Sequence, residues 1–292
     1  MQLSASALIG PPALAPQRAL IDRRLCVPRG ADVAVREAVA DGASSGRPEQ
    51  VRVEAMATLS QLAVDEAISV PMWWDAALRA SIVDGASGCL EREEVMREEA
   101  LTTLRNLAIN VANKQVMWEY DPVRSAVVDA AAAGRPKGVR AKALATLAHL
   151  AVDPINVKCM GDPMVRAAVV DGAAAERPEE VRVQALAMLR NLAMDHANRQ
   201  PMWADPAVRW AVADGAAAER PEQVRVQALA TLANLAAEPT NRNTMWAHTN
   251  VRAALADGAA AGRPEVVRDE ALATMANLAI DVQLTWPESL EG

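Results

Sequence analysis

The sequence contains no Phe, one Tyr and three Cys among 292 residues, and it has no excess of positive charge. With so few aromatic side chains, Ala, Leu, Val and Met must fill the interior, which favours closely packed helices over a β-sheet. The three cysteines are far apart and do not predict a disulfide framework, so we expect buried or half-buried thiols in a reducing compartment. The formal net charge of −7 argues against a nucleic-acid-binding surface. No apolar run is long enough to span a bilayer.

Two sequence patterns recur along the chain in steps of 42 to 45 residues. The first is an apolar-x-Asp tripeptide, most often V-x-D, that ends at Asp41, Asp84, Asp129, Asp171, Asp214 and Asp257. The second is an L-x-N-L-A pattern whose third position holds Gln61, Asn106, His149, Asn191, Asn234 and Asn277. Because the two patterns drift together along the chain, they indicate a duplicated unit of about 43 residues.

Residues 198–236 show how one unit is built. Asp205 and Pro206 are a favourable pair for a helix start, and Gly215 is a candidate for the end of that helix. A longer helix then begins at Pro221. Its apolar stripe, at three- and four-residue steps, consists of Val224, Ala228, Leu229, Leu232 and Leu235. A single unit cannot bury this stripe, whereas stacked units share a continuous core, so the sequence predicts an all-α solenoid.

The unit N-R-Q-P-M-W…V-R-W-A-V…P-E-Q-V-R-V-Q-A-L-A-T-L-A-N-L-A resembles the armadillo repeat, which has three helices per roughly 42 residues. The resemblance covers about residues 31–281, as five complete repeats and a partial first one. It implies a right-handed α-solenoid of three-helix armadillo-like repeats of about 43 residues, and a HEAT-like helical solenoid is the second choice.

In armadillo proteins the Asn of this pattern points from the third helix into the concave groove and hydrogen-bonds the main chain of an extended ligand. The resemblance implies this role for Asn106, Asn191, Asn234 and Asn277. Gln61 and His149 occupy the same position with different side chains. Importin-type grooves carry a Trp one turn earlier, where this chain has Ala or Thr, so nuclear-signal recognition of that kind is not expected.

The residues themselves also predict a polar strip on the third helix. Positions three and seven residues before the Asn share its face of the helix. We therefore add as candidate site residues Thr103, Thr146, Thr231, Thr274, Glu99, Gln184, Gln227 and Glu270. Such a strip suits the main chain of an extended peptide, although an ordinary solvated helix face is polar as well. Glutamates at positions 54, 99, 180 and 270 favour a neutral-to-basic segment as the ligand.

Two further sets of residues recur with the repeat. Met-Trp pairs at 72–73, 117–118, 202–203 and 245–246 predict a packing plug, with Cys159-Met160-Gly161 as the degenerate copy. The recurrent Asp lies at the negative end of its helix and therefore predicts an arginine partner within or between units. The candidate partners are Arg97, Arg140, Arg182, Arg225, Arg268, Arg124, Arg166, Arg209 and Arg252.

Motifs of catalysis and of metal or cofactor binding are missing. The sequence has no G-x-G-x-x-G, P-loop, G-x-S-x-G or H-E-x-x-H pattern. The three His residues fall at different positions of the repeat, without cysteines at metal-ligand spacing. We therefore predict a protein that is not an enzyme and that holds no cofactor or metal.

The sequence as a whole favours a protein-interaction scaffold that binds an extended peptide segment along the third helices. The alternative is an assembly subunit that docks through its ends or convex face, either as a monomer or end to end. Residues 1–30 predict a loosely ordered leader or a targeting segment, and residues 282–292 a tail. We expect an intracellular protein, cytoplasmic or nuclear, unless the leader directs it to an organelle.

Overall fold

The computed structural model of the chain describes residues 37–88, 94–160 and 163–280. The predicted leader, residues 1–30, and the predicted tail, residues 282–292, lie outside these residues, as do Cys26 and Cys89. Cys159 is exposed, so the prediction that it is a buried or half-buried thiol is wrong. Its helix is short and ends at this residue, which leaves the thiol at the surface.

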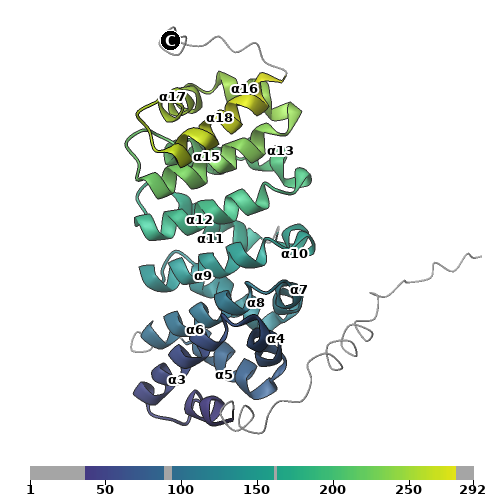
Figure 1. Cartoon of the computed structure of the whole chain (residues 1–292), viewed down its shortest axis with the longest axis vertical. Coiled ribbons are helices and arrows are strands. Elements are labelled where there is room, and N and C mark those ends of the chain that lie inside the picture. Colours follow the sequence, from purple (N-terminus) through teal and green to yellow (C-terminus); the bar gives the residue numbers. More distant parts are fainter. Residues whose placement is uncertain (1–36, 89–93, 161–162, 281–292) are drawn as a thin grey trace, which may run out of the picture.

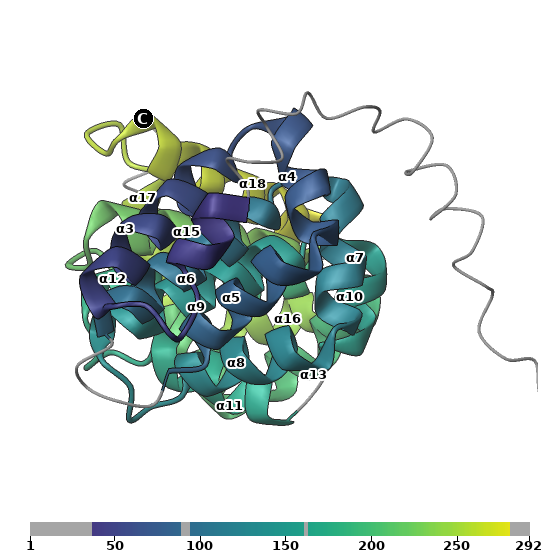
Figure 2. The same ribbon diagram turned by 90° about the horizontal axis from the view of Figure 1, so that it is seen from below.

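The described residues form helices and no strand, stacked as three parallel columns (Figures 1 and 2). The first helices of the repeats are α4 (Glu66–Trp74), α7 (Val111–Glu119), α10 (Pro154–Cys159), α13 (His196–Ala204) and α16 (Pro239–Ala247). The second helices are α5 (Ala76–Ala86), α8 (Asp121–Ala131), α11 (Pro163–Ala173), α14 (Pro206–Gly215) and α17 (Thr249–Gly258). The third helices are α3 (Glu49–Leu62), α6 (Glu94–Leu107), α9 (Lys137–Leu150), α12 (Glu179–Leu192), α15 (Glu222–Ala236) and α18 (Glu265–Ala279). The all-α solenoid is therefore confirmed.

The helix boundaries follow the local sequence. Asp205 accepts a hydrogen bond from the backbone N–H of Ala207 at 2.9 Å, and Pro206 is the first residue of α14, as predicted. Proline also precedes five of the third helices, α6 being the exception among those described. Four of these five helices then carry Glu in their positive first turn.

The recurrent glycine near the end of the second helix has a packing role. A Cβ at Gly215 would lie 3.0 Å from the Cβ of Ala228 and 3.1 Å from Leu186, and Gly172 is equally crowded. Helix α14 does end at Gly215, but the backbone there is not left-handed, so the glycine is not needed as a stop signal. It lets the second helix approach the third helix closely.

A buried arginine joins each repeat to the next. It lies on the third helix of one repeat and binds the Asp at the end of the second helix of the following repeat. The pairs are Arg52–Asp84 (3.2 Å), Arg97–Asp129 (2.6 Å), Arg140–Asp171 (2.6 Å), Arg182–Asp214 (2.7 Å) and Arg225–Asp257 (2.7 Å). The predicted Asp–Arg pairing is thus confirmed for Arg97, Arg140, Arg182 and Arg225, and it runs between repeats. The Arg52–Asp84 pair is an additional one that was not predicted.

Most of these aspartates also bind a second arginine, from the loop that follows their own helix. These pairs are Arg135–Asp129, Arg177–Asp171, Arg220–Asp214 and Arg263–Asp257. We call the Asp with its two arginines the clamp. The other predicted set has a different role, because Arg124, Arg209 and Arg252 lie over the ring of a Trp six residues earlier, at 5.7 to 5.9 Å.

Asparagines of the first helices add a second link between repeats. Asn113, Asn156 and Asn241 each donate to the end of the third helix before them and to a carbonyl of the preceding first helix, at 2.9 to 3.2 Å. Asn198, the equivalent residue of α13, donates to Leu192 O at 3.0 Å and, among the described residues, to no carbonyl of α10.

The clamp at Asp214 predicts a large stability effect. The side chain of Asp214 is 12% exposed and that of Arg182 only 4%, so Asp214→Ala leaves a buried guanidinium without its carboxylate. We expect the free energy of unfolding, from urea denaturation followed by circular dichroism, to fall by about 3 kcal/mol. The control is Asp41→Ala, whose pair with Arg47 is half exposed, and which should change stability by no more than about 0.5 kcal/mol. Equal losses in the two variants would contradict this role.

The clamp also predicts a pH dependence. Burial alone would raise the pKa of Asp129, but hydrogen bonds and charge from Arg135 and Arg97 outweigh it and hold the pKa below its ordinary value. A carboxyl with a lowered pKa in the folded state adds stability above its unfolded pKa and loses it as the pH falls through its folded pKa. We therefore expect stability to decline below about pH 4, and less steeply in Asp129→Asn. Parallel curves for the two proteins in urea titrations across this range would contradict the expectation.

Candidate functional site

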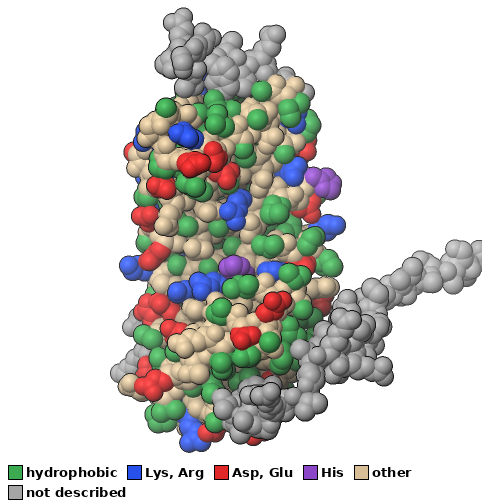
Figure 3. Space-filling view, in the orientation of Figure 1, with side chains coloured by type: hydrophobic (Ala, Val, Ile, Leu, Met, Phe, Trp, Pro, Cys, Tyr) green, Lys and Arg blue, Asp and Glu red, His purple; other side chains and the backbone are tan. Residues whose placement is uncertain are grey.

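The third helices form one continuous face of the molecule. Each packs side by side with the third helix of the next repeat, from α3 to α18. They lie at the front of Figure 1, and Figure 3 shows acidic and basic side chains interspersed with apolar ones on that face. We call this surface the third-helix face.

The predicted Asn ladder links neighbouring third helices. In four repeats the side-chain amide donates to a backbone carbonyl of the preceding third helix. These bonds are Asn106 to Ser60 O (2.7 Å), Asn191 to Ala148 O (2.8 Å), Asn234 to Arg190 O (3.1 Å) and Asn277 to Ala233 O (2.9 Å). One of the two N–H groups of each amide is therefore used within the fold, and the other makes no hydrogen bond among the described residues.

Two of these amides also hold an arginine on the third-helix face. Asn106 Oδ1 accepts from Arg105 Nη2 at 3.0 Å, and Asn191 Oδ1 accepts from Arg190 Nη2 at 3.4 Å. Asn106 and Asn191 are only 6% and 5% exposed, whereas the two arginines are partly exposed. In these two repeats the amide oxygen is therefore already occupied by an arginine.

The predicted threonine positions are wrong as surface sites. All four side chains are fully buried and donate to a carbonyl four residues earlier in their own helix. Each also lies within 3.2 to 3.5 Å of a carbonyl of the preceding third helix. The threonines in question are Thr103, Thr146, Thr231 and Thr274. This side of the helix packs against its neighbour, so these hydroxyls are unavailable to a ligand.

The remaining predicted residues lie at partly exposed positions, and Gln61 is exposed. Burial raises the pKa of Glu270, and Arg190 two repeats away opposes the shift, so their charges interact across α15. Burial lowers the pKa of His149, as do the charges of Lys114 and Arg105. The group of partly exposed residues comprises His149, Asn234, Asn277, Glu99, Gln184, Gln227 and Glu270. The Oε1 atom of Gln227 is buried and accepts no hydrogen bond from the described residues.

An apolar row that the sequence analysis missed lies beside the ladder. It consists of the residue that follows each L-x-N-L-A pattern, just past the end of the third helix. Its large members are Val64, Ile109, Val152, Met194 and Ile280, which are 46% to 65% exposed, and Ala237 is the small one. The signal was the recurrence of an apolar residue beyond the helix end, where a solvated loop would normally be polar.

A pocket opens where this row meets the ladder. It has a volume of about 350 Å³ and lies between the loop that follows α3 and the loop that follows α6. Asn106 lines it together with Val64 and Ile109, and Val111 and Glu66 lie on the adjoining first helices. A polar amide surrounded by exposed apolar side chains is an arrangement that can hold both a peptide group and an apolar side chain.

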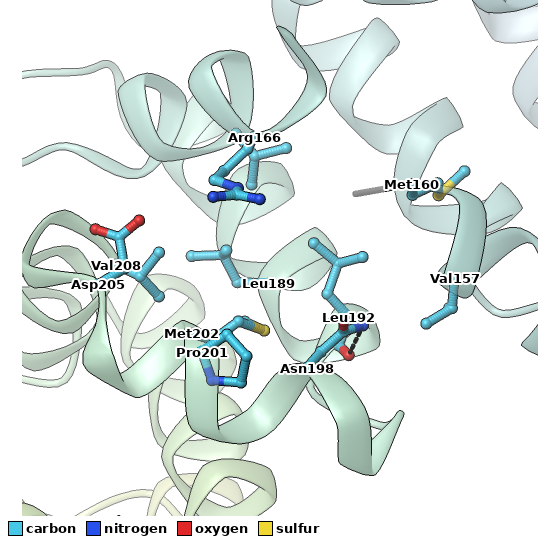
Figure 4. Close-up of a pocket in the computed structure, with 11 residues that line it drawn as sticks. Val157, Met160, Arg166, Leu189, Leu192, Asn198, Pro201, Met202, Asp205 and Val208 are labelled. Carbon is cyan, nitrogen blue, oxygen red and sulfur yellow. Dashed lines mark hydrogen bonds between the residues drawn. The ribbon is translucent and has the colours of Figure 1, made fainter. Parts of the chain in front are cut away.

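A second hollow lies among the first helices, where one repeat lacks its Trp. In most repeats a Trp lies six residues before the arginine of the second helix, as Trp203 does before Arg209. Met160 takes this position before Arg166. The hollow of about 100 Å³ is lined by Met160 and Arg166 of one repeat and by Pro201 of the next (Figure 4). One repeat later the indole of Trp203 fills the corresponding space and donates to Thr244 Oγ1 at 2.9 Å. The Met-Trp pairs are thus packing elements, with Trp73, Trp118 and Trp203 each 3% exposed.

Filling this hollow should stabilise the fold. We expect Met160→Trp to raise the free energy of unfolding by about 1 kcal/mol, because the indole occupies empty space beneath Arg166. Met160→Leu, which adds no volume, should have little effect. Thermal and urea unfolding measure both variants, and a destabilised Met160→Trp protein would show that the space is not equivalent to that of Trp203.

The titratable side chains of residues 37–88, 94–160 and 163–280 do not gather into a metal site. In this part of the chain no group of three or more His, Cys, Asp or Glu side chains is placed to hold a metal ion. None of the helices described in the structure is both long and apolar enough to traverse a membrane.

Comparisons with known proteins reveal the fold. No protein-family model and no curated protein matches the chain. Among solved structures, the designed armadillo repeat protein YIII(Dq)4CqI matches with a TM-score of 0.67 and 19% identity, over 82% of this chain and 98% of that one. The designed armadillo repeat protein YIII(Dq.V1)4CPAF in complex with peptide (KR)4 gives 0.68 and 18%, over 82% and 98%. Importin beta gives 0.59 and 15%, over 92% of this chain and 32% of importin beta. The chain has the armadillo/HEAT-like repeat fold, as its sequence resemblance implied.

Proposed function

We propose that this protein is a non-enzymatic interaction scaffold that binds an extended peptide segment of a partner protein along the third-helix face. One of the structurally similar designed proteins was solved with the peptide (KR)4, so this architecture is able to present a peptide-binding surface. The observation that carries the proposal for this chain is the pocket at Asn106, where the ladder and the apolar row meet.

The spacing of the face suits an extended chain. Axes of packed helices lie about 8–10 Å apart, and an extended peptide advances about 3.3 Å per residue. Two to three residues of ligand would therefore pass each repeat. Every second side chain of the ligand would point toward the apolar row, and the ligand main chain would lie against the Asn ladder.

The hydrogen-bonding part of the site is narrower than the sequence predicted. It consists of the second N–H group of the ladder amides, with Gln61 and His149 in the same position. The Oε1 atom of Gln227 is buried, so only the partly exposed remainder of this side chain is counted in the site. Glu99, Gln184 and Glu270 complete this set, and the buried threonines are excluded from it.

The charged side chains of the third-helix face favour a neutral-to-basic peptide, and they favour one alignment of that peptide along the face. Burial raises the pKa of Glu98, and Glu94, Glu180 and Glu99 raise it further against the opposing charge of Lys142. The pKa of Glu270 is raised at the other end of the face. A cationic ligand side chain would stabilise either carboxylate, whereas Arg105 and Arg190 would repel it.

Selection of binders from a random peptide library, followed by fluorescence polarisation, tests the proposal. We expect Ile109→Ser to weaken a selected peptide about tenfold, because it removes an apolar contact worth about 1.4 kcal/mol. Ile109 is 51% exposed, so the fold should not change.

The matched control is Trp210→Ser, which removes an apolar side chain that is 58% exposed on the second helix α14. Its affinity should equal that of the unmodified protein. Binding that is insensitive to Ile109→Ser, or equally sensitive to both changes, would rule out the third-helix face as the binding surface.

A further inference from the structure

The two ends of the stack expose positions that are buried at every junction inside it. On the C-terminal side the clearest case is Leu272 of α18, which is 51% exposed. The same position of the five earlier third helices is fully buried against the next repeat. Its occupants there are Met56, Leu101, Leu144, Leu186 and Leu229, each 0% exposed. The last described third helix thus keeps the contact residue of an internal helix, and no described repeat covers it.

Other residues of α18 repeat this pattern. Ala279 is exposed, whereas the alanines at the same position of the earlier repeats are at most 1% exposed. Arg268 occupies the position of the buried clamp arginines. It donates to Ala261 O at 3.4 Å, and no carboxylate among the described residues pairs with it. The C-terminal end therefore presents the arginine half of a clamp.

The N-terminal end exposes the opposite half of the same junction. Val51 of α3 is 43% exposed, and the residues at its position in the five later third helices are at most 1% exposed. Thr58 is exposed as well, and among the described residues it bonds only Glu54 O of its own helix. The threonines at its position in other repeats are fully buried. These are the residues by which a third helix packs on the repeat before it.

Asp41 completes the N-terminal surface. It stands at the clamp position, and its side chain binds Arg47 of its own loop. The aspartates from Asp129 to Asp257 bind a loop arginine with one oxygen and the arginine of the preceding repeat with the other. Asp41 thus lacks, among the described residues, the arginine that a preceding repeat would supply. At the two ends the chain carries the two complementary halves of one clamp.

We propose that the C-terminal end of one copy of this chain docks on the N-terminal end of a second copy and continues the stack. Arg268 would bind Asp41 of the next copy, and Leu272 would pack against Val51 and Ala55. By the pattern of the internal junctions, Thr58 would donate to Leu272 O and Gln61 to Ala276 O. The interface is thus specified in charge, shape and hydrogen bonding by the chain's own junctions, and it is independent of any ligand on the third-helix face.

Such a contact joins the C-terminal end of one copy to the N-terminal end of another. The resulting dimer therefore still has one free N-terminal end and one free C-terminal end. Repetition yields an open chain of copies, or a ring if the rotation closes. Repeat arrays that remain single normally end in repeats with a polar outer face. Leu272 and Val51 are apolar where such caps would be polar.

Sedimentation velocity of the full chain over a wide concentration range tests the proposal. We expect the average mass to rise above the 31.0 kDa of one chain as concentration increases. Leu272→Glu should reduce it to a single chain at all concentrations and leave the fold of that chain intact, because this side chain is already half exposed. The control Trp210→Glu adds the same charge on α14 and should leave the association unchanged.

Charge reversal identifies the partners. Arg268→Asp alone and Asp41→Arg alone should each abolish association, and the double variant should restore it, as should mixing the two single variants. A single chain at every concentration overturns the proposal, as does association that persists in Leu272→Glu. If the full chain is monomeric and removal of residues 281–292 starts the association, the chain's own tail is the occupant of the C-terminal face, and the proposal fails.

Discussion

The clamp, in which an aspartate binds the buried arginine of the preceding repeat and an arginine of its own loop, is the constraint on which the rest of the structure depends. Each guanidinium from Arg97 to Arg225 lies deep between two repeats and would be costly there without its carboxylate. The clamp fixes the second helix of one repeat against the third helix of the previous one. This in turn sets the separation of neighbouring third helices, and hence the spacing of every group on the third-helix face.

Much of the fold was predictable because the same sequence pattern occurs six times, so each helix could be located from several copies. The paired drift of the Asp and Asn patterns defined the units, and the Asp205-Pro206 and Pro221 signals located helix starts to within a residue. The Asp–Arg pairs were predicted and most of their arginines were named, but the sequence did not show which arginine binds which aspartate, because Asp214 lies nearer in sequence to Arg225 than to Arg182. Only the stacking of repeats decides that the arginine comes from the previous one.

The site was harder to predict, and the errors have one physical cause. Thr231 and Asn234 lie on the same side of a helix, and sequence spacing alone cannot tell whether that side meets solvent or another helix. The structure shows that it meets the preceding third helix, so the threonine is buried and the amide divides its hydrogen bonds. The apolar row from Val64 to Ile280 was missed because it lies beyond the last helical turn, outside the helical periodicity.

The repeat that lacks its indole has a mechanical consequence for the whole array. At the contact of α10 with α13 the column of first helices loses both the Trp and the asparagine bond to the preceding carbonyl, while α9 and α12 remain closely packed behind it. At this junction the columns of second and third helices remain packed, whereas the column of first helices has fewer contacts. This junction therefore has fewer links between first helices than its neighbours, and we expect a change in the curvature of the stack to occur here before it occurs at the other junctions.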